Sequence, residues 1–529
     1  MLLLLVELLH GALAFPATTI RRAAPSSTSS TIYPSIVERA SLSPGVASLR
    51  SDGNAIEGVH SEPSQPLTQT VLARVPELAS WDSWYAHPRI VANGHVHTIL
   101  AAKLRKTRAV KYHRQLVPTP DGGTLAVDLL AGIRRVEQSL DWRGSSKPTG
   151  TTVPSSLTTG GALPGAAEED GFTTFVDEPP PLDPERPMLL LASGLGGGSQ
   201  DTYVRSMAAT AAERGWQVAV INMRACGDSP VTSPRLFSAY RGANDDLRLA
   251  VRHLRATRLG GAEGGKGGKG GTLAAVGWSN SGTIVNNALA EQATTHIPTD
   301  DASHRIDAAA SIATPLNMPA NSANLQRPFH STVYDANLGK SLQRLWAAAR
   351  EQYVDPETGE MREVPYWDGL APADAPGGRA QLDATGVGVL HAKTFVADDG
   401  LASTARSIRE LDEAVTRRQY GYASVDDYYA AASSDQRLAL IAAPTLLLNA
   451  YDDPIVPGAS LCAALAAARA NPQLLMALTS HGGHLGWCER ADPWGGSAWC
   501  ERAACGFLEA ALGLEPTLEC EQASCEIFD

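Results

Sequence analysis

At roughly 150 residues per domain, the 529 residues of the chain allow three or four domains, and fewer where long tails and inserts take up chain. Lys and Arg total 44 against 56 Asp and Glu, so the formal net charge is −12, which repels nucleic-acid phosphates and anionic membrane surfaces. The composition therefore argues against nucleic-acid binding and favours a globular body of enzyme size.

Residues 1–37 have the features of a targeting leader. Residues 1–14 are apolar but too short for a membrane span, and Ala12-Leu13-Ala14 fits a signal-peptide cleavage site. Residues 15–37 are rich in Ser, Thr and Arg and contain no acidic residue, as in transit peptides. Together they resemble the two-part plastid presequence of algae with secondary plastids; secretion and a misassigned start are the alternatives. We expect no transmembrane segment in the mature chain.

The composition of the rest of the chain indicates an extension, a body with two inserts and a tail. Residues 38–80 are polar and rich in turn formers, which predicts a flexible extension, and residues 81–515 form the predicted body. Two inserts within the body, at about 134–186 and 259–271, are rich in Pro, Gly, Ser and Thr and are predicted to be disordered. Residues 516–529 form an acidic tail.

Apolar runs alternate with amphipathic stretches through the body. The predicted strands cover 188–194, 217–223, 272–278, 307–315, 444–450 and 474–479, and the predicted helices between them cover 202–215, 245–257 and 281–292. This alternation predicts an α/β fold with a mostly parallel, doubly wound sheet. The alternation fails from about 316 to 436, which predicts a helical cap inserted into the sheet, with ordinary helical packing as the alternative.

A sharp turn with a serine at its tip is predicted after the strand at 272–278. The sequence there is Gly277-Trp278-Ser279-Asn280-Ser281-Gly282, close to the Gly-x-Ser-x-Gly nucleophile elbow, with Ser281 in place of the second glycine. In that motif a strained strand-to-helix turn exposes the serine Oγ. Ser279 is therefore the candidate nucleophile.

A serine nucleophile needs a base and a carboxylate that orients the base. Asp452 and Asp453 follow the strand at 444–450, and His481 and His484 follow the strand at 474–479. Because parallel strands bring their carboxyl ends to one edge of the sheet, these side chains should meet Ser279 there. The order Ser, Asp, His along the chain is that of α/β-hydrolases. Either aspartate and either histidine fits this spacing.

Acyl transfer also needs backbone N–H donors for the oxyanion. The strand at 188–194 runs into the glycine loop 194–198, where the N–H of Leu195 would act together with that of Asn280. Neither glycine run fits a nucleotide site: Ser199 breaks the dinucleotide fingerprint, and Gly267 follows Lys266 where a P-loop requires Ser or Thr.

No metal or cofactor is implied by the seven cysteines. Paired Cys-x-x-Cys knuckles are absent from the sequence, so we interpret the cysteines as structural thiols. Cys520 and Cys525 would be able to pair in an oxidising compartment.

Several segments resemble the AB hydrolase 4 family of α/β-hydrolases, which contains medium-chain esterases and phospholipases. The similarity covers about 81–515 apart from the inserts. Its motifs are NGHVHTI at 93–99, TPDGGTLAVD at 119–128, ASGLGGGSQDTYVRS at 192–206, NMRACGDSPVTSPRLFSA at 222–239, GWSNSG at 277–282, SIRELDE at 407–413, GYASVDDYYAAASS at 421–434, LLLNAYDDPIVP at 446–457 and GGHLGW at 482–487.

The resemblance implies that Ser279 is the nucleophile, His484 the base and Asp453 the acid, with Asp452 as the alternative acid and His481 as a poorer base. The chain departs from the family pattern at four positions. These are Ser193 for His, Ala225 for Gly, Ser281 for Gly and His97 for Gln. Ser193 borders the oxyanion loop and Ser281 lies in the elbow, so we expect these two departures to affect the rate and the acyl preference more than the reaction type. We expect His97 to be structural.

We therefore predict a serine hydrolase that cleaves carboxylic esters, either medium-chain acyl esters or glycerolipids, through an acyl-enzyme. Its partner would be a small-molecule ester or lipid, with no nucleic acid, and the sequence indicates no oligomeric state. An acyltransferase that passes the acyl group to an alcohol or thiol is the first alternative. A catalytically silent binding protein on the same fold is the second.

Overall fold

The computed structural model describes residues 48–49, 56–79, 84–88, 93–105, 108–134, 172–260, 271–294, 302–355, 357–358, 366–368, 381–382, 389–391, 397–490, 498–515 and 526–528. Contacts divide the chain into Met1–Ser41 and Leu42–Asp529, and all described residues lie in the second unit. The predicted leader at 1–37 lies outside the described residues, as do Cys520 and Cys525, so these predictions stay untested.

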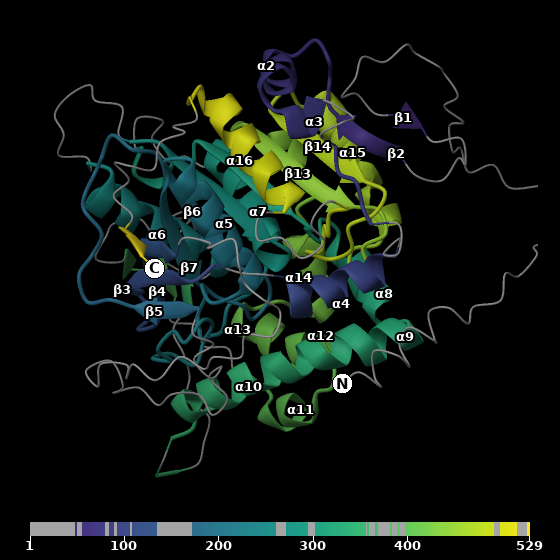
Figure 1. Ribbon diagram of the computed structural model, residues 1–529. Helices are drawn as coiled ribbons and strands as arrows, with labels where there is room; N and C mark the ends of the chain where they lie inside the picture. Colours follow the sequence, from purple (N-terminus) through teal and green to yellow (C-terminus); the bar gives the residue numbers. More distant parts are fainter. Residues whose placement is uncertain are drawn as a thin grey trace, which may run out of the picture. The chain divides into compact units, whose positions relative to one another are not determined.

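A 12-stranded sheet organises this unit (Figure 1). Six adjacent strands are parallel, in the order β14, β13, β9, β8, β6, β7. Their bounds are Leu474–Thr479 (β14), Thr445–Ala450 (β13), Ala308–Ile312 (β9), Leu273–Trp278 (β8), Met188–Ala192 (β6) and Gln217–Asn222 (β7). All six were predicted, and the mostly parallel α/β fold is confirmed.

Antiparallel strands extend both edges of the parallel core. On one side β4 (Thr124–Arg134) joins β7 and forms a hairpin with β3 (Val110–Pro118), and β5 (Thr173–Phe175) and β15 (Glu526–Phe528) complete that side. On the other side β2 (Ile56–His60) pairs with β14, and β1 (Ser48–Leu49) pairs with β2.

Helices cover both faces of the sheet because alternate strand residues point in opposite directions. In β6, Leu190 belongs to one core cluster, whereas Leu189 and Leu191 belong to the other. The first cluster includes residues of α6 (Ala243–Arg258), α7 (Asn280–Thr294) and α15 (Cys462–Ala470). The second includes residues of α2 (Pro66–Arg74), α5 (Thr202–Glu213) and α16 (Trp499–Leu512). The sheet is therefore doubly wound, as predicted.

The described part of the segment predicted to be a cap is largely helical. Its helices are α8 (Met318–Leu325), α9 (Pro328–His330), α10 (Ala336–Tyr353), α11 (Asp399–Thr404), α12 (Ile408–Leu411), α13 (Arg417–Gln419) and α14 (Val425–Ala432). Two single turns of π-helix, η3 (Ser331–Asp335) and η4 (Asp412–Thr416), interrupt them. Helices α10, α11 and α12 contact one another and lie side by side in Figure 1. The same segment also contains a small sheet that was not predicted, formed by β10 (Tyr366–Asp368), β11 (Gln381–Leu382) and β12 (Val389–His391).

The prediction that 38–80 is a flexible extension was wrong for its described part. Strand β2 continues the main sheet, with Val59 opposite Ala477, and two helices follow it, α2 and α3 (Pro76–Ala79). Val71 and Val75 are buried in the same cluster as α16, and a Cβ on Gly506 of that helix would lie 2.9 Å from a Val75 methyl carbon. A few apolar side chains hold this segment against the core. The composition of residues 38–80 is polar on average, so it did not indicate that these single residues would be buried.

Two further boundaries also need correction. The insert predicted to be disordered at 134–186 contains β5, whose Phe175 ring lies 4.6 Å from the Arg114 guanidinium carbon. The predicted tail at 516–529 contains β15, which pairs in parallel with residues 132–134 of β4. Both strands are three residues long and gain their hydrogen bonds only from distant partners, so local composition carries no signal for them.

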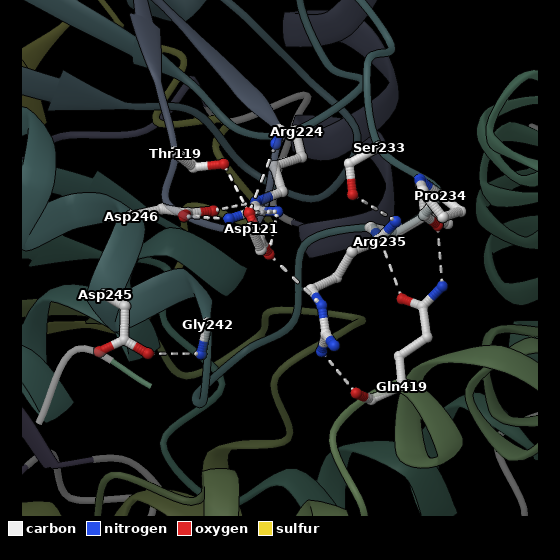
Figure 2. Close-up of polar contacts among 12 residues, drawn as sticks. Thr119, Asp121, Arg224, Ser233, Pro234, Arg235, Gly242, Asp245, Asp246 and Gln419 are labelled. Carbon is white, nitrogen blue, oxygen red and sulfur yellow. Dashed lines mark hydrogen bonds and ion pairs between the residues drawn. The ribbon is translucent and has the colours of Figure 1, made fainter. Parts of the chain in front are cut away.

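A buried ion network joins the β3–β4 turn to α6 and to the cap (Figure 2). Arg224 lies between two carboxylates, with 2.8 Å to Asp121 and 2.7 Å to Asp246, and all three side chains are at most 4% exposed. Burial by itself would raise the pKa of Asp121, but Arg224 and Arg235 hold it below its usual value. Arg235 donates to the backbone carbonyl of Gln419 in α13, so the network reaches from the sheet into the cap.

Substitution of Asp246 by Asn should destabilise the fold, because Arg224 loses one of its two buried counter-charges. We expect the free energy of unfolding to fall by about 3 to 5 kcal/mol, measured by denaturant titration. The matched control is Asp426→Asn, which breaks an exposed ion pair with Arg409 and should not move the unfolding midpoint. Equal midpoints for the two variants would contradict a structural role for the network.

Candidate active site

Ser279 lies at the turn between β8 and α7, at the carboxyl edge of the parallel strands. Its φ is +50°, in the left-handed region that residues other than glycine rarely adopt. Its backbone N–H donates to the carbonyl of Ile312 in β9 at 2.9 Å, and its carbonyl accepts from the N–H of Gly282 at 3.0 Å. The neighbouring strand and the new helix thus hold the strained turn from both sides, and the side chain is only half buried.

Two glycines allow this turn to close. A Cβ on Gly277 would lie 2.5 Å from the carbonyl oxygen of Ser281, and a Cβ on Gly282 would lie 1.9 Å from the hydroxyl of Thr314. Ser281 replaces the second glycine of the elbow pattern, yet it is buried within the first turn of α7. The close approach therefore falls at Gly282, one residue later, so the structure accommodates serine at position 281.

His484 joins Ser279 to Asp453. The Ser279 Oγ lies 3.0 Å from the His484 Nε2, and the His484 Nδ1 lies 2.8 Å from a carboxylate oxygen of Asp453. The other Asp453 oxygen accepts from the backbone N–H groups of Ile455 and Val456 at 2.7 and 2.9 Å. With its side chain fully buried, Asp453 is fixed as the acceptor for one ring nitrogen, which leaves the Nε2 to accept the serine proton.

The alternative acid, Asp452, points elsewhere. One of its oxygens lies 3.0 Å from the Nδ1 of His481, and the other accepts from the backbone N–H of Gly483 at 2.9 Å. The structure therefore pairs each aspartate with a different histidine. Of the candidates left open by the sequence, only Asp453 and His484 form a hydrogen-bonded chain to Ser279, and Asp452 braces the loop that carries His484.

Helix α4 (Gly94–Leu104) supports the same loop, and this role was not predicted from the sequence. The Thr98 hydroxyl accepts from the backbone N–H of His484 at 2.8 Å and donates to the carbonyl of Gly94 at 2.7 Å. A Cβ on Gly94 would lie 1.8 Å from the Asp452 carbonyl oxygen. His97, in the same helix, is fully buried and accepts from the Cys488 N–H at 3.3 Å, so it lies in the core as expected.

The two predicted oxyanion donors flank Ser279. Asn280 is the first residue of α7, where backbone N–H groups lack intrahelical partners. Leu195 lies in the glycine loop after β6, and within the described part of the chain its N–H has no hydrogen-bond partner. Both residues line the cavity that contains Ser279 and His484. The glycine loop and the N-terminus of α7 thus both border the cavity that contains the candidate nucleophile.

A half-buried tyrosine fixes the glycine loop, and this role was not predicted from the sequence. The Tyr203 hydroxyl accepts from the Gly194 N–H at 2.9 Å and donates to Asp201 at 2.8 Å, and Asp201 also accepts from the Gly198 N–H at 3.2 Å. Burial raises the pKa values of both Tyr203 and Asp201, so the tyrosine keeps its proton. The segment between Gly194 and Gly198 is thereby held at both ends.

Ala225, which stands where the family has glycine, adopts a backbone conformation that favours glycine. Ala225 has a φ of +62°, a left-handed conformation that costs an alanine roughly 1 to 2 kcal/mol and glycine little. It lies in the loop after β7 between Arg224 and the fully buried Cys226. The resemblance places glycine here, and the geometry explains why glycine fits the position better. Ser193, the remaining departure, is buried just before the glycine loop.

Ser279 opens into a cavity of about 330 Å³ between the sheet edge and the cap. This volume is at the lower end of the range for small-molecule sites. Its apolar lining comes from both parts, and includes Leu236, Phe237, Leu325, Leu338, Leu342, Ile408, Leu411 and Leu485. The segment predicted to be a cap thus supplies much of the wall that faces the candidate nucleophile.

Three acidic residues also line the cavity: Asp201 lies beside the glycine loop, and the other two lie in the π-helical turns of the cap. Asp412 accepts from the Tyr429 hydroxyl at 2.9 Å, and burial raises its pKa to about 6. Asp335 accepts from the Ile408 N–H at 2.9 Å, and burial raises its pKa as well. Turns of π-helix often occur at functional sites, and here they direct carboxylates toward the substrate space.

Neither a membrane span nor a metal cluster is found in the described ranges. No helix there is both long and apolar enough to cross a bilayer. Nor do the His, Cys, Asp and Glu side chains of that part form a group of three or more that would hold a metal ion.

The raised pKa of Asp412 predicts a pH-dependent stability. Because the folded state binds this proton more tightly than the unfolded chain, the stabilisation is complete below about pH 4 and is lost as the pH rises through about 6. The free energy of unfolding, relative to an Asp412→Asn variant, should fall by about 2 to 3 kcal/mol between pH 4 and pH 7. Parallel pH profiles of unfolding for the two proteins would contradict this assignment.

Comparison with known proteins agrees with this geometry. No protein-family model matches the chain. A monoacylglycerol lipase of Saccharomyces cerevisiae is 26% identical over 86% of this chain and 87% of its own length. The embryogenesis-associated protein EMB8 of Picea glauca is 26% identical over 80% and 72%, and the human phospholipase ABHD3 is 24% identical over 79% and 77%. These similarities extend over most of the chain and agree with the resemblance to the AB hydrolase 4 family, and the chain has a fold of the α/β-hydrolase type.

Proposed function

We propose that the protein is a carboxylic ester hydrolase that works through Ser279, His484 and Asp453. The observation that carries the proposal is the chain of hydrogen bonds at 3.0 and 2.8 Å that links the strained serine to the histidine and then to a fully buried carboxylate. Such a chain activates a serine hydroxyl because the histidine can take its proton. The lipase and phospholipase named among the relatives support the same reaction class.

In the first step, Ser279 attacks the ester carbonyl while His484 takes the hydroxyl proton. Asp453 stabilises the imidazolium and holds the ring so that its Nε2 faces the serine. The N–H groups of Leu195 and Asn280 stabilise the oxyanion of the tetrahedral intermediate. When this intermediate collapses, His484 returns the proton to the leaving alkoxide, and the alcohol departs from an acyl-Ser279 intermediate.

In the second step, water attacks the acyl group. His484 takes a proton from the water, the same two N–H groups stabilise the second oxyanion, and the proton passes to Ser279 Oγ as the acid leaves. Asp453 remains ionised throughout, because its role is to orient and stabilise the histidine. Both steps use one base and one oxyanion site, so the five residues account for the whole cycle.

The cavity supports medium-chain acyl esters or glycerolipids as substrates. Leucine and isoleucine side chains from the sheet edge and the cap give it an apolar wall, which suits an acyl chain. A volume of about 330 Å³ suits a short or medium chain better than two long ones. The monoacylglycerol lipase and the phospholipase among the relatives act on lipids by their names, in line with this substrate class.

Acyl transfer to an alcohol or thiol would use the same acyl-Ser279 intermediate. It differs only in the acceptor of the second step, and it depends on how well the cap excludes water. Ester hydrolysis needs no further component, so it is the function that we propose.

The test is the turnover of medium-chain 4-nitrophenyl esters by purified protein and three variants. Ser279→Ala and Asp453→Asn should each lower kcat by about 10⁴-fold, because the first removes the nucleophile and the second removes the carboxylate that orients His484. Asp452→Asn is the matched control, because it changes the adjacent carboxylate, which pairs with His481. We expect it to lower kcat by less than about tenfold.

Full activity in Ser279→Ala would contradict the proposed nucleophile. If Asp452→Asn lost as much activity as Asp453→Asn, the assignment of the acid would fail. A well-folded wild-type protein without turnover on any acyl chain length would favour the silent binding protein instead.

A further inference from the structure

One side chain in the cavity wall has a buried polar atom without a hydrogen-bond partner among the described residues. Asn321 lies in α8, is only 4% exposed and lines the cavity that contains Ser279. Within the described residues, its Oδ1 is buried and makes no hydrogen bond. Buried polar atoms are nearly always hydrogen-bonded, since an unmade bond costs folding free energy. The amide therefore has unused hydrogen-bonding capacity in the wall of the cavity.

The neighbouring asparagines show that this is specific to position 321. Asn317 caps α8 through the N–H of Ala320 at 3.0 Å and donates to Asp435 at 2.8 Å. Asn324, one turn after Asn321, donates to the carbonyl of Pro454 in the acid loop at 2.8 Å. Both have structural partners, so helix stability and cap attachment explain them. Neither purpose explains Asn321.

The other polar groups of the wall indicate what Asn321 would bind. Asp201, Asp335 and Asp412 line the same cavity, so an anionic group would be repelled there. Arg409 also lines it, but its guanidinium is paired with Asp426 at 2.8 Å. A hydroxyl group can donate to a carboxylate or to the amide oxygen and can accept from the amide nitrogen. An uncharged hydroxyl-bearing group therefore matches this wall.

We propose that Asn321, together with Asp412, forms a polar subsite that binds a free hydroxyl group of an uncharged ester. The inference rests on the proposed ester hydrolysis and narrows its substrate class. The apolar wall takes the hydrocarbon part of such an ester, and the subsite satisfies the Asn321 amide and selects against alkyl esters without a hydroxyl group. It also selects against esters that carry a carboxylate or phosphate.

The test compares two hexanoate esters that differ only in hydroxyl groups, 2,3-dihydroxypropyl hexanoate and propyl hexanoate. We expect wild-type protein to favour the dihydroxypropyl ester by at least about tenfold in kcat/KM. Asn321→Leu keeps the approximate shape but removes both polar atoms, and should lower this ratio by about tenfold. Asn337→Leu makes the same change at an exposed position of α10 outside the cavity, and should leave the ratio as in wild type.

The outcomes distinguish a failure of the proposed subsite from a failure of the proposed ester hydrolysis. If wild type and Asn321→Leu hydrolyse both esters with the same ratio, the subsite is overturned and ester hydrolysis stands. If wild type hydrolyses neither ester nor any 4-nitrophenyl ester, the proposed function fails and the subsite fails with it. If the ratio of kcat/KM for the dihydroxypropyl ester to that for the propyl ester falls in Asn321→Leu but not in Asn337→Leu, the subsite is supported.

If Asn321→Leu does not fold, a second variant tests the subsite. Asp412→Asn removes the negative charge but retains an oxygen that can accept from Tyr429. Wild type should favour ethyl hexanoate over carboxymethyl hexanoate, and the variant should narrow this preference by about tenfold in kcat/KM. Unchanged discrimination between the two esters would overturn the role given to Asp412.

Discussion

The turn between β8 and α7 is the constraint on which the rest of the site depends. Ser279 adopts its left-handed conformation only because Gly277 and Gly282 let the strand, the helix and Thr314 approach one another closely. That conformation directs the Oγ out of the sheet edge toward His484. It also places the first free N–H of α7 beside the nucleophile. Strain at one residue, held by the packing around it, thus sets the positions of the nucleophile and of one oxyanion donor.

The surrounding loops are fixed to this turn by hydrogen bonds that do not themselves react. Thr98 and Asp452 hold the loop that carries His484, and Tyr203 holds the glycine loop through its hydroxyl. On the cap side, Arg235 links the buried ion network to α13. The cap then contributes both an apolar wall and the polar groups that would select the substrate. The loops at the sheet edge therefore position the catalytic groups, whereas the cap would select the substrate.

Sequence patterns predicted the parallel strands and the elbow, because hydrophobic runs and the glycine spacing around Ser279 are local signals. They left the choice between Asp452 and Asp453 open, since adjacent carboxylates follow the same strand and differ only in which histidine each faces. They also missed β2, which depends on pairing with β14, more than 400 residues away. The unpaired amide of Asn321 has no sequence signal, because it depends on what the neighbouring helices leave unsatisfied.

The central claim is that His484 and Asp453 activate Ser279, and covalent labelling tests it most directly. Protein would be treated with a fluorophosphonate probe, digested and analysed by mass spectrometry, with Ser279→Ala as the control. The account predicts a single adduct on the peptide that contains Ser279, absent in the variant, with a rate that falls steeply in Asp453→Asn. A folded protein that takes no label at Ser279, or labels equally fast without the Asp453 carboxylate, would contradict it.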